Sequence, residues 1–317
     1  MNSQQQIIDV AGMVFDEDCW EAYLRTFAEY APDYATMLAR RLAVTAGFSP
    51  IEFADGPVDD LLSALRESGA LRLDLDAYVT GLTAGGIRHQ VIHSTPWSLP
   101  DGTKVNDRVA SFARRHPDRL HAWASVNLAD PDEAIAEVRR CYEQLGLRGA
   151  SVTHFLDVAD PVGDGAHAFY RVLEELRMPL WVHTGHNLSR RVPMDWCMWR
   201  HLDTIARCHP DLILIAGHGG WPWIGEMMAL CQRHPHVYLE LSTHRPRHMI
   251  KPGSGWESLF AHGASSIRHK VLFGSISWVH GRSAPELAHE TSEWPITETV
   301  RTAWLHDNAA PILGLSR

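Results

Sequence analysis

Histidines are the side chains of this sequence with the clearest potential for chemistry. The chain of 317 residues contains 20 of them, and histidine both titrates near neutral pH and ligates metals. His183 and His218 each directly follow an apolar run, at residues 180–182 and 213–217. A histidine held at such a position can act as a general acid or base, which contributes roughly 10²–10⁴-fold to a rate, or it can bind a metal ion.

Polar and aromatic residues also follow the other short apolar runs of the chain. If these runs are strands of one parallel barrel, the residues after them converge on one pocket. A single histidine at a strand end is most often a hydrogen-bonded structural residue, but five converging imidazoles would be costly to bury without a function. We therefore expect an acid/base pair of His183 and His218, assisted by His154 or His93. The expected substrate-binding residues are Trp97, Asn127, Trp221, Glu240, His244, Ser275 and Trp278, although ordinary packing explains the tryptophans equally well.

The elements that would position these residues alternate regularly along the chain. Short apolar or β-branched runs are separated by longer amphipathic stretches, a pattern typical of βα units around a parallel sheet. Eight such units with right-handed crossovers can close into a barrel. The sequence therefore predicts an α/β fold, a single (β/α)₈ TIM-barrel domain over residues 1–317, with strands at residues 7–10, 90–93, 122–126, 149–153, 180–183, 212–216, 237–241 and 271–273.

Residues 14–70 interrupt this regular spacing. They contain no convincing strand, and segments 19–41 and 57–68 are predicted to be helices joined by the Gly- and Pro-containing linker 46–53. A helical insertion after the first strand would lie over the barrel mouth. It is predicted to be a lid or a wall of the substrate site, and equally a dimer contact, so a homodimer is one expectation.

The composition excludes several classes of partner. A formal net charge of −9, without clusters of Lys and Arg, argues against nucleic acid. Neither a secretory leader nor an apolar run of membrane-spanning length is present, so we expect a soluble, cytoplasmic protein whose partner is a small-molecule substrate. Five widely spaced cysteines without a Cys-x-x-Cys pair indicate free thiols.

Five motifs in a fixed order carry a family resemblance. They lie at residues 180–185 (LWVHTG), 216–223 (AGHGGWPW), 237–242 (VYLELS), 272–275 (LFGS) and 307–310 (DNAA). Through these motifs, roughly residues 75–315 resemble the amidohydrolase superfamily. Within it, the sequence is similar to the amidohydrolase-related branch, which includes aminocarboxymuconate-semialdehyde decarboxylase, resorcylate decarboxylases and pyrone-dicarboxylate lactonase. The resemblance also implies a TIM barrel.

The same resemblance implies a metal site whose ligands are only partly retained. In such enzymes a divalent metal is typically held by a pair of residues after strand 1, a histidine after strand 5 and an aspartate after strand 8. His183 matches the strand 5 ligand and His218 the strand 6 histidine, but Ala11, Met13 and Ile276 occupy the remaining positions. The alanine and isoleucine side chains have no atom that can bind a metal, and the methionine thioether is a poor ligand for such an ion. We therefore expect no cofactor. A relocated divalent metal at His183 and His218 is the alternative.

Three functional hypotheses follow. Without a metal to lower the pKa of water, histidine acid/base chemistry remains suited to activated substrates. We expect a metal-independent hydrolase or lyase that hydrolyses, decarboxylates, dehydrates or cyclises a small oxygenated aromatic or polyketide-like molecule. The alternatives are a non-catalytic protein that binds a ligand or partner, and a hydrolase or decarboxylase with a relocated divalent metal site.

Overall fold

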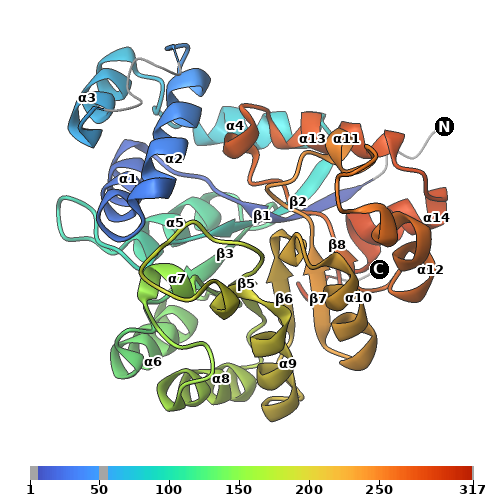
Figure 1. The fold of residues 1–317 in the computed structure, drawn as a ribbon. Helices are drawn as coiled ribbons and strands as arrows, with labels where there is room; N and C mark the ends of the chain where they lie inside the picture. The colour runs from blue at the N-terminus through green and yellow to red at the C-terminus, as the bar shows by residue number, and fades with distance from the viewer. Residues whose placement is uncertain (1–5, 50–55, 316–317) are drawn as a thin grey trace.

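The protein is a barrel of eight parallel strands. The computed structural model describes residues 6–49 and 56–315, and its strands follow one another around the sheet in chain order (Figure 1). The Val10 amide donates to the Phe273 carbonyl at 2.9 Å, so the chain after the last strand meets the first strand and closes the ring. The predicted TIM barrel is confirmed. Its strands are β1 (Ile7–Gly12), β2 (Ile87–His93), β3 (Leu120–Ser125), β4 (Ala150–Val152), β5 (Leu180–His183), β6 (Leu214–Gly217), β7 (Val237–Glu240) and β8 (Val271–Leu272).

The strands pack on both faces because successive side chains point to opposite sides of the sheet. Along β5, Trp181 belongs to the apolar cluster that fills the barrel, whereas Leu180 and Val182 pack in the cluster formed with the surrounding helices. Gly217, at the end of β6, leaves room for the Trp181 indole, since a Cβ there would lie 2.1 Å from the ring. Indole packing thus supports β5, which ends at His183, and β6, which ends just before His218.

Helices surround the strands and follow local sequence signals. In α6, Asp130 caps the first turn, proline follows at the first helical position, and Ala134 and Val138 face the core. No helix in the described part of the chain is long and apolar enough to cross a membrane. The helices that follow β2 to β8 are α5 (Val105–Arg115), α6 (Pro131–Arg140), α7 (His154–Asp157), α8 (Asp164–Leu176), α9 (Trp199–Cys208), α10 (Ile224–Arg233), α11 (Pro246–Met249), α12 (Ala264–Ser266), α13 (Ala284–Glu290) and α14 (Glu298–Thr302).

The predicted helical insertion lies between β1 and β2. It contains α1 (Glu17–Tyr30), α2 (Pro32–Thr45) and α3 (Val58–Ser68), which stand together at the upper left of Figure 1, and α4 (Leu75–Ala84) then leads into β2. The single helix predicted over residues 19–41 is divided in two at Ala31, because Pro32 has no amide hydrogen to continue the first helix. The predicted helix over 57–68 is confirmed as α3. Residues 50–53 of the predicted linker lie outside the described residues.

Candidate active site

A cavity of about 360 Å³ lies where the strands run into the following loops and helices. Its lining includes seven of the eleven residues that the sequence predicts for the site: His93, Trp97, His183, His218, Trp221, His244 and Trp278. The other four do not line it. His154 is fully buried, Glu240 and Ser275 are buried, and Asn127 is exposed and accepts a hydrogen bond from the Ala129 amide. The strand ends therefore bring most of the predicted residues together.

The insertion forms an aromatic wall of this cavity. Tyr23 of α1 lies edge-on to Trp278, with ring centroids 5.9 Å apart, and tilted against Trp97 at 5.8 Å. Tyr34 of α2 stacks on Phe155 at 5.2 Å with an interplanar angle of 22°. Helices α1 and α2 together contribute to the lining Tyr23, Phe27, Tyr34, Met37, Leu38 and Arg41.

Two imidazoles lie close together in the cavity lining. The rings of His183 and His218 lie 4.9 Å apart at 77°, and Phe155 packs edge-on against His183 at 4.7 Å. Burial lowers the pKa of His183 to about 3, with a further contribution from His186. Burial, followed by the nearby His183, also lowers the pKa of His218 well below its usual value. Both rings are therefore neutral at physiological pH, and each offers one ring nitrogen as a hydrogen-bond acceptor.

A hydrogen-bonded chain fixes the orientation of His218. The Ser242 hydroxyl donates to Glu240 Oε2 at 2.8 Å, so its oxygen accepts from His218 Nδ1, also at 2.8 Å. While Glu240 is ionised, the proton of the neutral ring is then on Nδ1, which leaves the Nε2 lone pair free. We call this chain the Glu240–Ser242–His218 relay. It presents a hydrogen-bond acceptor of defined orientation beside the cavity.

Glu240, which is buried behind the cavity lining, anchors this relay. Besides Ser242 Oγ, its carboxylate accepts from Trp181 Nε1 at 3.1 Å, from the His218 amide at 3.2 Å and from the Ser242 amide. Burial raises the pKa of Glu240 to about 7, although these four donors all favour the ionised form. The carboxylate thus ties β5, β6 and β7 together.

His93 and His154 are held differently. His93 Nε2 donates to the Val10 carbonyl at 3.0 Å, and its Nδ1 is buried without a partner among the described residues. His154 Nε2 lies 3.2 Å from the Tyr170 hydroxyl, which itself donates to the Pro161 carbonyl. His154 is therefore directed toward α8, behind the cavity wall, whereas His93 reaches the cavity.

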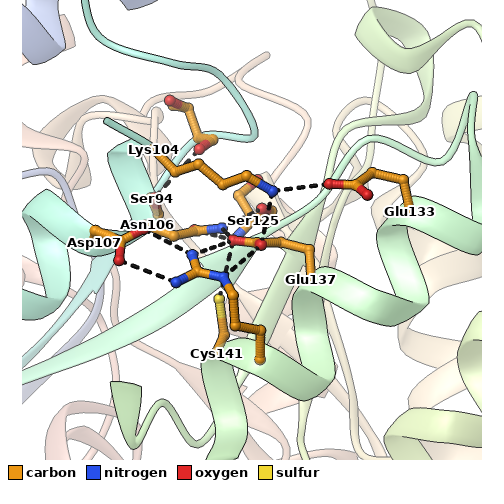
Figure 2. Close-up of polar contacts among 10 residues, drawn as sticks. Ser94, Lys104, Asn106, Asp107, Ser125, Glu133, Glu137 and Cys141 are labelled. Atoms are coloured by element: carbon orange, nitrogen blue, oxygen red, sulfur yellow. Dashed lines mark hydrogen bonds and ion pairs between the residues drawn. The ribbon is translucent and has the colours of Figure 1, made fainter. Parts of the chain in front are cut away.

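A second polar network fixes the end of β3. Figure 2 shows Lys104 reaching Glu133 and Glu137, and Asn106 lying between Glu137 and Ser125. The Asn106 side chain both donates to the Ser125 carbonyl and accepts from its amide, each at 3.0 Å. Because Ser125 lines the cavity, this network holds part of the cavity floor in place.

Among the cavity-lining residues that the sequence did not single out are one carboxyl group and one guanidinium group. Asp157, at the end of α7, is buried, and Arg41 of α2 extends to the cavity from the insertion. Asp157 follows His154 by three residues, and this carboxyl just after a strand end was a signal in the sequence. Nothing in the sequence indicated Arg41, because its position depends on how the insertion packs on the barrel.

Solved structures with the same fold include metal-bound decarboxylases. A dihydroxybenzoic acid decarboxylase from Polaromonas, with bound manganese and the inhibitor 2-nitroresorcinol, has a TM-score of 0.65 at 16% identity over 99% of this chain and 98% of that one. A 5-carboxyvanillate decarboxylase from Novosphingobium aromaticivorans, complexed with manganese and 4-hydroxy-3-methoxy-5-nitrobenzoic acid, has a TM-score of 0.67 at 16% identity, with the same two coverages.

These structures correct the expectation that no cofactor takes part, because they point to a divalent metal. The side chains of this chain fit such an ion incompletely. In the parts of the chain that the structure covers, 6–49 and 56–315, no three His, Cys, Asp or Glu side chains are grouped to hold a metal. Met13 and Ile276 line the cavity and Ala11 is buried. His183 and His218 offer two nitrogen donors, whereas a catalytic ion of this type is commonly held by about three protein ligands.

Sequence comparison identifies the family. A gamma-resorcylate decarboxylase from Rhodococcus jostii is 27% identical over 161 residues, which cover 46% of this chain and 47% of that protein. A 2-amino-3-carboxymuconate-6-semialdehyde decarboxylase from Dictyostelium discoideum is 23% identical over 288 residues and 79% of each protein. The chain thus spans about half the length, or less, of the resorcylate decarboxylases it matches. Because residues 59–315 match the family model described as Amidohydrolase, the chain belongs to the amidohydrolase family.

Proposed function

We propose that this protein decarboxylates a small hydroxylated aromatic acid. The observation that carries the proposal is the Glu240–Ser242–His218 relay, which presents a free imidazole nitrogen beside an aromatic-walled cavity. A cavity of about 360 Å³ suits a single substituted ring, and apolar walls with a few convergent polar groups are typical of small-molecule sites. The relatives named for resorcylate and carboxymuconate decarboxylation support this reaction class.

Charge at the cavity also favours an acid as substrate. Arg41 is the one Lys or Arg among the described residues that line the cavity, and it forms no ion pair with any residue in the described ranges. A cation at the rim of an apolar cavity raises the local concentration of anions. The carboxylate of a hydroxybenzoate would be attracted by this charge, while its ring packs against Tyr23, Trp97 and Trp278.

The relay would activate the ring of such a substrate. A phenolic hydroxyl beside the carboxylate can donate its hydrogen bond to His218 Nε2, which increases electron density in the ring. Greater electron density at the carbon that bears the carboxylate makes it easier to protonate, and protonation must precede loss of carbon dioxide. Ser242 and Glu240 act as positioning residues here, because they keep the proton of His218 on Nδ1.

The test is consumption of hydroxylated benzoates by the purified protein. Candidate substrates are 2,6-dihydroxybenzoate, salicylate and 5-carboxyvanillate, assayed with and without added Mn²⁺, with loss of substrate and release of carbon dioxide followed together. His218→Asn should abolish turnover, and His262→Asn is the matched control because His262 is exposed. Binding of these acids without conversion would instead favour a non-catalytic ligand-binding protein. Conversion without carbon dioxide release would refute decarboxylation.

A further inference from the structure

Asp157 is the one carboxyl group among the described residues that line the cavity. It ends α7, the four-residue helix that follows β4, and it is only 6% exposed. Phe155, two residues earlier on the same helix, packs directly against His183. The helix that carries this carboxyl therefore lies next to the pair of imidazoles.

The hydrogen bonds of Asp157 leave one oxygen available. The Leu128 amide donates to Oδ2 at 3.1 Å, and no described cation or other donor is paired with the carboxyl. A proton on this group must then be carried by Oδ1, because Oδ2 already accepts from the backbone. Tyr34 of α2 stacks on Phe155 and covers the helix from the insertion side.

The surroundings keep the carboxyl protonated. Burial raises the pKa of Asp157 to about 8, and the Leu128 hydrogen bond opposes this only in part. The titratable groups around it are Tyr170 of α8, which interacts electrostatically with Asp157, and His154 on α7 itself. Tyr34 of α2 and His183 of β5 flank the same helix through Phe155, and in the described part of the chain no ion pair joins any of these groups to Asp157. Burial raises the pKa of Tyr34 far above its usual value, so that its phenol holds its proton too tightly to be an efficient donor.

We infer that Asp157 is the acid that delivers a proton to the ring carbon bearing the carboxylate. This inference rests on the proposed decarboxylation. The Oδ1–H bond breaks as a C–H bond forms at that ring carbon, and Asp157 becomes a carboxylate. The bond between the ring and the carboxylate then breaks, its electron pair returns to the ring and carbon dioxide leaves. A proton from water restores Asp157, so the reaction consumes one proton per substrate.

Asp157→Asn tests this assignment directly, since the amide oxygen can still accept from Leu128 but the side chain has no acidic proton. We expect kcat to fall by roughly 10²–10⁴-fold with little change in KM. Asp157→Glu should restore part of the activity. The matched control is Asp160→Asn, because Asp160 is exposed and outside the cavity lining.

Two further measurements separate an acid from a structural residue. The wild-type kcat should decline above a pH of about 8, as Asp157 loses its proton. In deuterium oxide, the wild type should exchange the ring hydrogen of the decarboxylated product, and Asp157→Asn should not.

Full kcat and full exchange in Asp157→Asn would overturn the assignment while leaving the proposed decarboxylation intact. A wild type that is inert toward every hydroxybenzoate would overturn both. If Asp157→Asn does not fold, the wild-type pH profile and Asp157→Glu decide. A wild-type kcat that stays constant above pH 8, together with an unchanged kcat in Asp157→Glu, refutes the role.

Discussion

Replacing Ser242 with alanine tests whether one hydroxyl sets the protonation pattern of His218. In the relay, Ser242 Oγ lies 2.8 Å from both His218 Nδ1 and Glu240 Oε2. Its removal leaves the buried Nδ1–H without an acceptor, which costs about 1–3 kcal/mol. The ring can lower that cost by moving its proton to Nε2, where the proposed chemistry needs a lone pair.

The expected result follows from the size of this cost. Since about 1.4 kcal/mol corresponds to a tenfold change in an equilibrium or rate, kcat toward a hydroxybenzoate should fall by roughly 10- to 100-fold. KM should change little, because Ser242 is not part of the cavity lining. Kinetics would be measured beside ¹⁵N NMR of the histidine side chains, which distinguishes the two neutral ring forms.

The matched control is Ser189→Ala, because Ser189 is also buried and its hydroxyl accepts from the Arg191 amide, away from the relay. This variant should keep the wild-type kcat and the wild-type form of His218. The reasoning would be refuted if Ser242→Ala retained kcat within about twofold of wild type and its His218 still carried the proton on Nδ1.

Three other predictions concern charge, pH and packing. Arg41→Met should raise KM for an aromatic acid by several-fold at low salt without lowering kcat, and the difference should shrink in about 1 M salt because an exposed charge is screened. Burial would raise the pKa of Glu137, but hydrogen bonds from Arg140, Lys104 and Asn106 lower it to about 2. Its contribution to stability is therefore complete above its ordinary pKa of 4.5 and is lost as the pH falls toward 2; Glu137→Gln should flatten this part of a pH series of urea denaturation curves. Gly217→Ala should lower the unfolding free energy by about 1–3 kcal/mol, because the new methyl group meets the Trp181 indole; an unchanged melting temperature would contradict this packing.

The barrel was predictable because its signals are local. Each strand is a short apolar run, and β5 begins and ends at the predicted residues, Leu180 and His183. The C-terminal ends of all strands in a parallel barrel lie at the same face. The convergence of His93, His183 and His218 therefore followed from the fold alone. The division of the first insertion helix was also readable in the sequence, since Pro32 marks it.

Side-chain direction was not predictable from strand position. His154 lies two residues after the end of β4, yet the chain turns there into α7 and its ring meets Tyr170 behind the wall. Asn127 follows β3, but its side chain caps its own turn at Ala129. Predicting the relay would have required knowing that Ser242, after β7, contacts His218, after β6. These two residues are 24 positions apart in the sequence. Spacing along the chain determines which strands are neighbours but not how their side chains are turned.

The residues at the positions where the resemblance implies metal ligands are part of the aromatic wall. Trp278 Nε1 lies 3.2 Å from Met13 Sδ, and Trp20 of α1 packs edge-on against the Trp278 ring at 5.3 Å. The Ile276 amide donates to the Ala11 carbonyl, so the backbones of both positions are joined across the barrel closure. A carboxylate or a second imidazole here would be buried against these rings, with a large desolvation cost. Apolar side chains at 13 and 276 and an aromatic insertion therefore stabilise each other, and the imidazoles that line the cavity come instead from the ends of β2, β5, β6 and β7.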